Sequence, residues 1–376
     1  MNAVNLPPLS LYIHVPWCVK KCPYCDFNSH TFDELPEAKY LEQLKQDFIG
    51  QTQFIQKREL KSIFFGGGTP SLMSAEFFIK LIKFLKENIV FSSDIEITLE
   101  ANPGTFEADK FAGFHESGIN RLSLGVQSFQ DSFLNTLGRI HSADDAIAAI
   151  EQAKKIGFDN FNIDLMFGLP KQKIKDALFD LKQAVQLNPT HLSWYQLTIE
   201  QNTHFYKHPP KLPKDDLIFD MQQQGQQYIA DSGFNQYEIS AYSKTKLESQ
   251  HNLNYWSFGD YIGIGAGAHG KVTVNHEIIR TRRTRQPNNY IEQPLQLLSE
   301  PVVKEDLLFE GLMNGFRLKQ GINWSVLEQY AFQDITQVKK RLKAFEQKGL
   351  ILSDDKRVWL SEKGYLFLDD ILGELV

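Results

Sequence analysis

Three cysteines within eight consecutive positions are the residues of this chain with the most specific chemistry. Cys18, Cys22 and Cys25 are the only cysteines among its 376 residues. Thiolates bind soft metals and iron–sulfur clusters, and an odd group this tight cannot form a disulfide framework. The spacing therefore predicts a metal or cluster site in a reducing compartment. Structural zinc takes four protein ligands, so zinc stays open as an alternative in which His14 or His30 supplies the fourth.

Polar residues also follow several short apolar runs. The string GGGTP at residues 66–70 follows one run, Glu100 ends another, Gln127 follows a third and Asp164 lies in a fourth. The carboxyl ends of parallel strands gather at one end of a barrel, so these groups would meet around a bound ligand. The glycines let a ligand approach the backbone, although the string lacks the lysine of a phosphate-binding loop. Each polar residue alone is more simply explained as a cap or turn; their coincidence over several strands predicts a site.

Six strand-then-helix units are predicted over the first two-thirds of the chain. The strands are Leu9–Val15, Ser62–Phe65, Ile95–Glu100, Arg121–Val126, Phe161–Phe167 and His191–Ile199. Helical patterns cover Glu37–Gln56, Ala75–Asn88, Phe106–Ser117, the residues from Gln127 through Gly157, Lys173–Leu187 and Asp216–Ser232. Parallel neighbours need a crossover helix, and six units are too few for a closed eight-stranded barrel. The predicted fold is α/β, an incomplete (β/α)6 barrel, with a doubly wound sheet as the alternative.

The last third of the chain has a different pattern. Tyr237–Tyr242 is a further candidate strand, and Gly259–Gly270 is predicted to be a glycine-punctuated loop. From Lys304 we expect amphipathic helices, including a basic one over Thr336–Gln347, then a short strand at Val358–Leu360 and a final helix. We therefore predict three regions: a barrel over 1–235, an extension over 236–300 and a small C-terminal helical, winged-helix-like domain over 301–376.

Composition argues against several classes of protein. The net charge is −6 and the apolar fraction 42%, which suits a soluble folded protein and disfavours a nucleic-acid binder. No run of about 18 apolar residues occurs, so no membrane span is predicted. Met1–Ser10 has no lysine or arginine and contains Pro7 and Pro8, unlike an export signal, so we expect a cytoplasmic protein.

The CxxxCxxC spacing, with Tyr24 before the last cysteine, resembles the radical S-adenosylmethionine (radical SAM) enzymes. The resemblance implies a [4Fe–4S] cluster on the three cysteines, whose free iron is chelated by the amino and carboxylate groups of S-adenosylmethionine (SAM). In that family one electron from the cluster cleaves the sulfonium to a 5′-deoxyadenosyl radical, so the site has to be enclosed and dry.

Motifs along nearly the whole chain resemble the coproporphyrinogen III oxidase-like branch of these proteins. They include GGGTP, Leu-Gly-Arg-Ile-His around Arg139, and Asn-Ile-Asp-Leu-Met-Phe-Gly-Leu-Pro around Asp164. The resemblance implies that SAM is contacted by Tyr12, Tyr24, Gly67, Gly68, Thr69, Glu100, Gln127, Arg139 and Asp164. Without the family pattern, Arg139 is equally well explained as an exposed helix residue.

Two functions within that branch have different local signatures. The oxygen-independent coproporphyrinogen III dehydrogenases carry a further cysteine one residue beyond the third, whereas here Asp26 and Phe27 follow Cys25. The heme chaperones carry HNxxYW, which is present as HNLNYW from His251 to Trp256. The resemblance therefore favours heme binding and transfer, with the dehydrogenase as the alternative. A radical SAM enzyme acting on RNA or another small molecule is a third class, and the acidic balance disfavours RNA.

The side chains of HNxxYW suit heme. His251 would ligate the iron through a neutral imidazole, while Tyr255 and Trp256 would stack on the porphyrin. A lone histidine beside aromatic residues is also a common core residue. Spacing leaves three rival ligands open: His14, His141 and His269.

The expected partners are heme and a heme-accepting respiratory enzyme at the membrane, with homodimerisation as a further implication of the resemblance and no nucleic acid. A basic cluster interrupts the otherwise acidic chain at Arg280, Arg282, Arg283 and Arg285. We hypothesise that some of these arginines pair with the heme propionates, since a guanidinium fork fits a carboxylate. A solvated loop explains the cluster as well.

Overall fold

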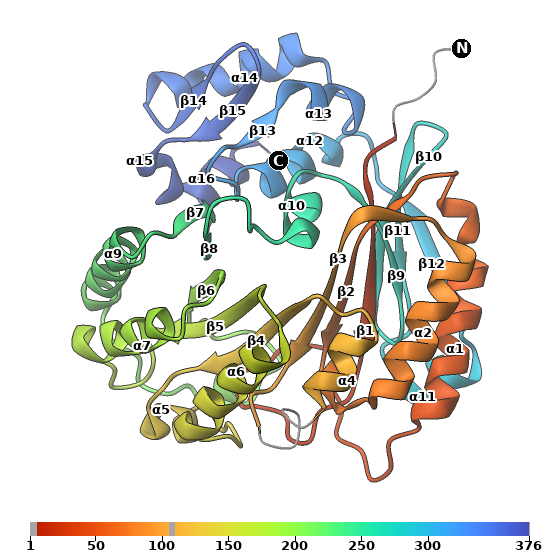
Figure 1. The fold of residues 1–376 in the computed structure, drawn as a ribbon. Coiled ribbons are helices and arrows are strands. Elements are labelled where there is room, and N and C mark those ends of the chain that lie inside the picture. Colours follow the sequence, from red (N-terminus) through yellow and green to blue (C-terminus); the bar gives the residue numbers. More distant parts are fainter. Residues whose placement is uncertain (1–5, 105–109, 376) are drawn as a thin grey trace.

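The computed structural model describes residues 6–104 and 110–375, and a curved twelve-stranded sheet dominates it (Figure 1). Six strands lie side by side in chain order: β1 (Leu9–Val15), β2 (Leu60–Gly67), β3 (Phe91–Ala101), β4 (Arg121–Gln127), β5 (Phe161–Phe167) and β6 (His191–Gln196). Each is parallel to the next. The predicted incomplete barrel is confirmed and the doubly wound alternative is wrong, because a doubly wound sheet reverses its strand order at a switch point.

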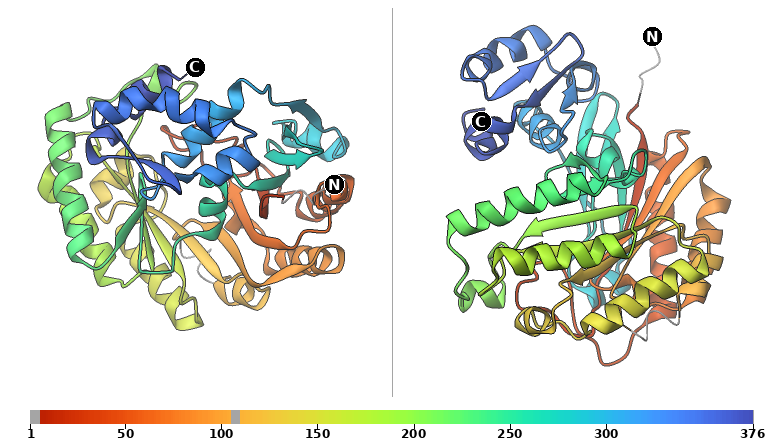
Figure 2. Two further views of the ribbon diagram at one scale, coloured as in Figure 1. Left: turned by 90° about the horizontal axis from the view of Figure 1, so that it is seen from above. Right: turned by 60° about the vertical axis from the view of Figure 1, so that its left-hand side comes forward.

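Crossover helices cover the outer side of the curved sheet (Figures 1 and 2). They are α1 (Glu37–Gly50), α2 (Ala75–Asn88), α4 (Phe111–Glu116), α5 (Asp131–Thr136), α6 (Ala143–Ile156), α7 (Ile174–Gln186) and α9 (Asp215–Asp231). Helix α2 begins where the Ser74 side chain accepts a hydrogen bond from the Phe77 N–H. Its apolar stripe is buried at helical spacing: Phe77, Phe78, Leu81, Ile82 and Leu85.

Most of the predicted elements lie where the sequence put them. Strands β1 and β5 and helix α2 have the predicted bounds. The helix predicted from Glu37 to Gln56 ends earlier, at Gly50, and a 3-10 turn η1 (Thr52–Phe54) follows. The helix predicted at Phe106–Ser117 is α4, although residues 106–109 lie outside the described residues.

Further strands extend both edges of the sheet. At the β6 edge lie β7 (Asn235–Glu238) and β8 (Ala241–Ser243); at the β1 edge lie β9 (Asp260–Ile264), β10 (His269–Val274), β11 (Glu277–Arg282) and β12 (Leu298–Pro301). The single strand expected at Tyr237–Tyr242 is therefore a pair of antiparallel strands. The loop predicted at Gly259–Gly270 is confined to residues 265–268, because β9 is a buried strand parallel to β1 and β10 begins at His269. Gly263 fits there because a Cβ would collide with the backbone carbonyl of His269 on β10.

Helix α10 (Gln250–Trp256) lies on the inner side of the curve and packs on β1, β2 and β9 (Figure 1). Above it in Figure 1 lies the C-terminal part of the chain: α12 (Asp306–Gly315), β13 (Ile322–Asn323), α13 (Trp324–Gln329), α14 (Ile335–Gln347), β14 (Ile351–Ser353), β15 (Arg357–Leu360), α15 (Glu362–Tyr365) and α16 (Leu368–Gly373). Its three strands form a separate antiparallel sheet in the order β13-β15-β14. The helix–strand–helix–helix–strand–strand order confirms the winged-helix-like expectation. The boundaries at 235 and 300 stay predictions.

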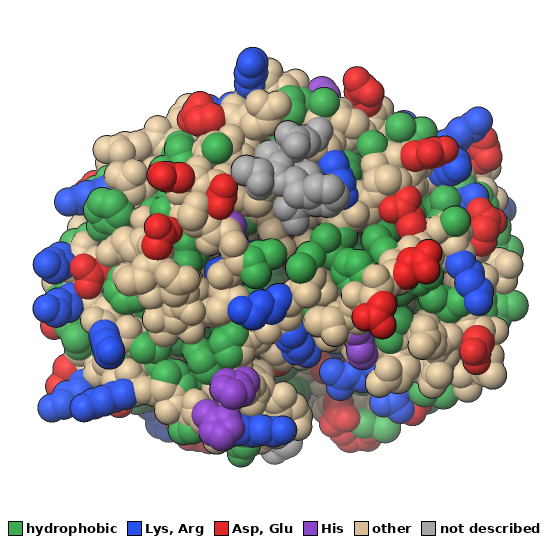
Figure 3. Space-filling model, turned by 90° about the horizontal axis from the view of Figure 1, so that it is seen from below, with side chains coloured by type: hydrophobic (Ala, Val, Ile, Leu, Met, Phe, Trp, Pro, Cys, Tyr) green, Lys and Arg blue, Asp and Glu red, His purple; other side chains and the backbone are tan. Residues whose placement is uncertain are grey.

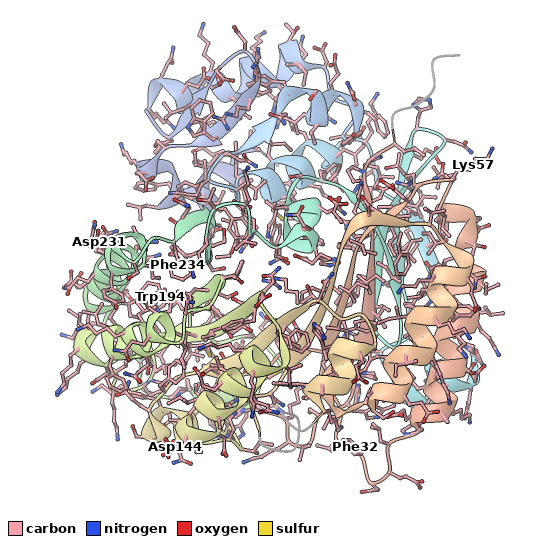
Figure 4. The ribbon with its side chains drawn as sticks, viewed as in Figure 1. Phe32, Lys57, Asp144, Trp194, Asp231 and Phe234 are labelled. Carbon is pink, nitrogen blue, oxygen red and sulfur yellow. The ribbon has the colours of Figure 1, made fainter. Side chains whose placement is uncertain are left out.

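Close packing holds the β6 side of the barrel together. Trp194 on β6 and Phe234 after α9 belong to the same buried core, and Figure 4 shows both near α9. Gly225 is required in α9, since a Cβ there would overlap the Trp194 ring. Seen from below, the surface carries acidic and basic side chains interspersed with hydrophobic ones (Figure 3). Within 6–104 and 110–375, no helix is both long and apolar enough to cross a membrane.

Candidate functional site

The cysteine-containing loop begins where β1 ends, and backbone pairing fixes its base. The Cys18 N–H donates to the His30 carbonyl at 3.0 Å, and the His30 N–H donates to the Pro16 carbonyl at 2.7 Å. A turn brings the Cys25 N–H to the Cys22 carbonyl at 3.1 Å. All three thiols are free; Cys18 is buried and the other two are half-buried. The loop therefore presents three unpaired sulfur ligands from a tethered backbone.

The histidines considered as zinc ligands have other partners. Both ring nitrogens of His14 are engaged, Nδ1 with the Tyr12 hydroxyl at 2.9 Å and Nε2 with the Asn28 carbonyl at 2.8 Å. His30 Nε2 lies 3.2 Å from Asn28 Oδ1. The geometry therefore does not favour the zinc alternative.

A first cavity of about 410 Å³ lies at the carboxyl ends of the parallel strands. It brings together the three cysteines and eight of the nine residues that the resemblance assigns to SAM: Tyr24, Gly67, Gly68, Thr69, Glu100, Gln127, Arg139 and Asp164. These residues come from the cysteine loop, from strands β2 to β5 or their ends, and from the segment after α5. Tyr12 lines a neighbouring cavity instead.

The glycines after β2 are needed for packing against the cysteine loop. Gly67 has φ +115°, and a Cβ there would collide with the His14 ring. A Cβ on Gly68 would collide with the backbone of Trp17, the residue before Cys18. The string GGGTP therefore lets the end of β2 lie directly against the base of the loop.

Arg139 is half-buried between the cysteine loop and the strand ends and lies outside any helix, so the exposed-helix explanation is wrong. Its Nη2 donates to Asn102 Oδ1 at 2.6 Å and to the Gly125 carbonyl at 2.7 Å, and Nη1 lies 3.8 Å from Cys22 Sγ. Its Nε is buried and has no hydrogen-bond partner among the described residues. A buried unpartnered donor beside three thiols fits an anionic group such as the carboxylate of SAM.

Two carboxyl groups face the same cavity. Burial raises the pKa of Glu100 to about 8; the neighbouring Asp164 adds to the rise, and the Gly67 N–H, 3.2 Å from Oε2, opposes it. Burial also raises the pKa of Asp164, against hydrogen bonds from Asn162, Ser193 and Ser123. Such paired carboxyls can accept hydrogen bonds from the hydroxyls and ammonium of a ligand once they ionise.

Three further residues of the first cavity were not singled out from the sequence. Tyr195 near the end of β6 donates to Gln127 Oε1 at 2.8 Å, Asn102 accepts from Arg139, and Ser123 donates to Asp164 at 3.1 Å. Tyr195 could have been found by the strand-end rule. Asn102 and Ser123 carry no sequence signal that separates them from ordinary turn and strand residues.

A second cavity of about 580 Å³ adjoins the first, since Phe27, Gly67 and Glu100 line both. Its volume lies in the range of cofactor sites, about 300–1,000 Å³. Most of its lining is aromatic or imidazole: Tyr12, His14, Phe64, His251, Tyr255, Trp256, Tyr261 and His269. The structure therefore brings the three heme-directed residues of HNxxYW into one cavity next to the cysteines.

His251 lies at the start of α10 and is held in a definite orientation. Its Nδ1 is 3.2 Å from Ser62 Oγ, which itself donates to Ser10 Oγ at 2.7 Å, so Ser62 can accept the Nδ1 proton. Its ring stacks on Phe64 with centroids 4.9 Å apart. Burial, with the nearby Arg121 charge, lowers the pKa of His251 to about 3. The imidazole is therefore neutral at physiological pH, and Nε2 has no hydrogen-bond partner among the described residues.

Helix α10 is anchored at both ends. At its start, Glu96 on β3 accepts the N–H groups of Gln250 at 3.0 Å and His251 at 3.1 Å. At its end, Trp256 lies under the Arg317 guanidinium, 4.3 Å from the ring centroid. The Tyr255 ring contacts Trp256 edge-on, with centroids 4.7 Å apart. Parts of the barrel and of the C-terminal region thus hold the HNxxYW side chains.

The three rival histidines differ in their placement. His269 lines the second cavity and is exposed, whereas both nitrogens of His14 are engaged. His141 lines neither cavity and lies 3.1 Å from the Val126 carbonyl. Of the rivals, only His269 combines a place in the cavity with exposure.

The arginine cluster is divided by its partners, which narrows the set of arginines that could pair with the heme propionates. Arg283 is buried and pairs with Asp47. Arg280 pairs with Glu310 at 2.5 Å and Arg282 with Glu300 at 3.2 Å. Only Arg285 lines the second cavity. One arginine of the four is therefore placed to meet a ligand carboxylate there.

The radical SAM superfamily model matches residues 12–182, and the HemN C-terminal domain model matches residues 302–367. The fold is similar to that of coproporphyrinogen III oxidase (HemN) from Escherichia coli, described as a radical SAM enzyme. The TM-score is 0.83 over 98% of this chain and 90% of that chain. Sequence identity to it is 24%, so this likeness concerns the fold.

Sequence relatives are similar over their full length. The heme chaperone HemW of Haemophilus influenzae is 49% identical over 374 residues, 98% of each chain. That of Escherichia coli is 46% identical over 373 residues, again 98% of each chain. That of Bacillus subtilis is 35% identical over 379 residues, 97% of this chain and 98% of the relative. With this similarity, and with the cysteine loop and HNxxYW side chains lining adjoining cavities, the chain belongs to the heme chaperone HemW family of the radical SAM superfamily.

Proposed function

We propose that this chain is a heme chaperone, which binds heme in the second cavity and passes it to a heme-requiring enzyme. The observation that carries the proposal is the state of His251: a neutral imidazole in an aromatic cavity, with Nδ1 held by Ser62 and Nε2 without a partner among the described residues. A fixed tautomer with one free lone pair is what an iron ligand requires. The similarity to the heme chaperones HemW of Haemophilus influenzae and Escherichia coli supports the same function.

In this proposal the other residues of the second cavity orient the porphyrin. Tyr255 and Trp256 offer ring faces and apolar area. Arg285 is the arginine available to a propionate, and His269 is the candidate for a second axial ligand. The acceptor would be a respiratory enzyme at the membrane, and two copies of the chain would associate during transfer; both are carried over from the resemblance.

We further propose that Cys18, Cys22 and Cys25 hold a [4Fe–4S] cluster and that SAM occupies the first cavity. The donor set fits: three free thiols, the unpartnered Nε of Arg139, and the acceptor groups of Glu100 and Asp164. When bound, the cluster and SAM supply one-electron, radical-forming chemistry. The chain's own residues bind, orient and enclose these groups, and Glu100 and Phe27 separate them from the second cavity.

The alternative function is coproporphyrinogen dehydrogenation, and the experiments below distinguish it from heme transfer. The fold is shared with an enzyme of that kind, but Phe27 stands where those dehydrogenases carry a further cysteine. Phe27 instead lines both cavities with an exposed ring. The local chemistry of the loop therefore favours transfer over dehydrogenation.

Heme titration of anaerobically reconstituted protein, followed by absorbance, tests the function. We expect His251→Ala to weaken heme binding at least about tenfold, because an iron–imidazole bond is lost. The heme affinity of His269→Ala tests whether His269 is the second axial ligand of the iron. His208→Ala, an exposed histidine outside both cavities, is the matched control and should bind as the wild type does.

The same preparations should be assayed for protoporphyrinogen formed from coproporphyrinogen. Retention of heme by wild type, its loss in His251→Ala and no turnover are the expected results. Robust turnover of coproporphyrinogen would contradict the chaperone function and assign the dehydrogenase activity instead. Equal heme affinity in wild type and His251→Ala would remove His251 as the ligand.

A further inference from the structure

A line of hydrogen-bonded side chains leads from the first cavity into the interior of the barrel. Asn162 Nδ2 on β5 donates to Asp164 Oδ1 at 2.8 Å. Asn162 Oδ1 lies 2.7 Å from His191 Nδ1 on β6. His191 Nε2 lies 2.9 Å from the Tyr237 hydroxyl on β7. Asp164 lines the first cavity, whereas the other three residues line neither cavity.

The far end of this line reaches α10. Burial raises the pKa of Tyr237; the Arg121 charge opposes the rise, and so do the nearby Asn252 side chain and Ser249 backbone. The Tyr237 ring also packs with Leu253 and Trp256. Asn252 is the second residue of HNxxYW and lines the second cavity. The line therefore joins the carboxyl group of one cavity to the helix that forms a wall of the other.

All hydrogen bonds along the line run in one direction. Asn162 Nδ2 donates to both Asp164 and Ser123 Oγ, the latter at 2.8 Å, so its Oδ1 is an acceptor and His191 Nδ1 must be the donor. Burial, with the nearby Arg121 charge, lowers the pKa of His191 well below its usual value, so the ring is neutral. Its Nε2 then accepts from the Tyr237 hydroxyl. Donors thus point from Tyr237 towards Asp164 at every step.

We propose that Asn162, His191 and Tyr237 are positioning residues that make the hold on α10 depend on whether a ligand engages Asp164. The inference rests on the proposed function, with SAM as the ligand of the first cavity. Hydrogen bonds of an aligned chain strengthen one another. A ligand donor that competes for the Asp164 oxygens weakens the bond from Asn162, then those of His191 and Tyr237. Helix α10 is then held less firmly, and heme leaves faster.

A purely structural role for the line makes a different prediction. Buried polar groups are normally hydrogen-bonded, so the three side chains would in that case only satisfy one another. Removing the Tyr237 hydroxyl would then lower stability without changing any effect of SAM on heme. The inference instead requires that the SAM effect disappear. By linkage, heme should weaken SAM binding by the same factor in the wild type.

Heme release to excess apomyoglobin, followed by absorbance with and without saturating SAM, separates the two roles. In reconstituted wild type we expect SAM to speed release about fivefold or more, in the usual range of coupling between sites. In Tyr237→Phe the ratio of the two rates should fall to about one. Tyr242→Phe is the matched control: it removes a buried tyrosine hydroxyl on neighbouring β8, outside the line, and should keep the wild-type ratio.

A second measurement is independent of heme. Hydrogen–deuterium exchange of residues 250–256 should quicken on addition of SAM in wild type and Tyr242→Phe, and stay unchanged in Tyr237→Phe. If Tyr237→Phe does not fold, His191→Asn replaces it, because it keeps a donor towards Asn162 and lacks the acceptor for Tyr237. Equal SAM effects in wild type and Tyr237→Phe, or none in either, would overturn the inference. Failure of the wild type to bind heme would instead refute the proposed function, and the exchange data alone would then decide the inference.

Discussion

At the scale of single residues, Glu100 makes SAM binding depend on pH. Burial raises its pKa to about 8, so in the ligand-free protein the group is largely protonated at pH 7 and binds a ligand donor poorly. Binding favours the carboxylate, so affinity should rise with pH through about 8. Equilibrium dialysis of SAM at about pH 6.5 and 8.5 should show roughly tenfold tighter binding at the higher pH.

The same shift has a consequence for stability. The pKa of the Glu100 carboxyl is 4.5 when unperturbed and about 8 in the folded protein. Between these two pH values the carboxyl is ionised in the unfolded chain and protonated in the folded protein, so the free energy of unfolding falls as the pH rises across this window. Glu100→Gln should remove both this loss and the pH dependence of SAM affinity. An affinity in wild type that is flat between the two pH values would contradict the prediction.

At the scale of elements, the position of α10 depends on one carboxylate from a distant strand. Glu96 accepts from the Gln250 and His251 N–H groups, and Arg121 lies 3.8 Å from it. Glu96→Ala would leave the buried His251 N–H unpaired, which costs about 1–3 kcal/mol. We expect a lower urea midpoint, faster amide exchange in residues 250–256, and weaker heme binding.

A milder variant and a control variant test this prediction further. Glu96→Gln keeps one side-chain acceptor and should have a smaller effect than Glu96→Ala. Glu76→Ala removes an exposed glutamate in the first turn of α2, paired only with Lys80, and should change neither exchange nor heme binding. Unaltered exchange of 250–256 in Glu96→Ala would mean that α10 is held by its other contacts.

At the scale of the whole molecule, a buried cluster around Asp47 joins the start of the chain to the segment after β9. Asp47 on α1 accepts from the Gly265 N–H at 3.0 Å and the Tyr290 hydroxyl at 2.7 Å, and it pairs with Arg283. Asp47→Asn would leave a buried guanidinium without its counter-charge, at a cost of about 3–5 kcal/mol. Urea unfolding should show this loss, and Asp47→Asn with Arg283→Leu should recover part of it.

Variants in this cluster and beside it should affect stability and heme binding separately. Its arginine is two positions from Arg285, which lines the second cavity. Arg285→Ser should therefore weaken heme binding with little change in the urea midpoint, whereas Asp47→Asn should lower the midpoint. The reverse pattern would mean that the cavity wall, and not the Asp47 cluster, stabilises this edge of the sheet.

The sequence by itself determined the features whose physical causes are local. The cysteine motif lies within a few neighbouring residues and can be read directly from the sequence. The periods of strands and helices follow from the order of apolar side chains, so β1, β5 and α2 could be predicted with their bounds. Parallel strands expose their carboxyl ends together, which is why most of the first cavity could be predicted from the residues after each strand. The family resemblance added Arg139 and the HNxxYW residues, whose roles no local pattern expresses.

Only the tertiary structure decided which side chains share a cavity and which are already paired. Strand β9 was taken for a loop because its glycines depend on the close approach of β10, a contact between residues that sequence period does not reveal. Tyr12 lines the second cavity and not the first, where it was expected, and three of the four clustered arginines form ion pairs with carboxylates. Hydrogen bonds and ion pairs need partners at about 3 Å, and only the folded chain sets such distances between residues far apart in sequence.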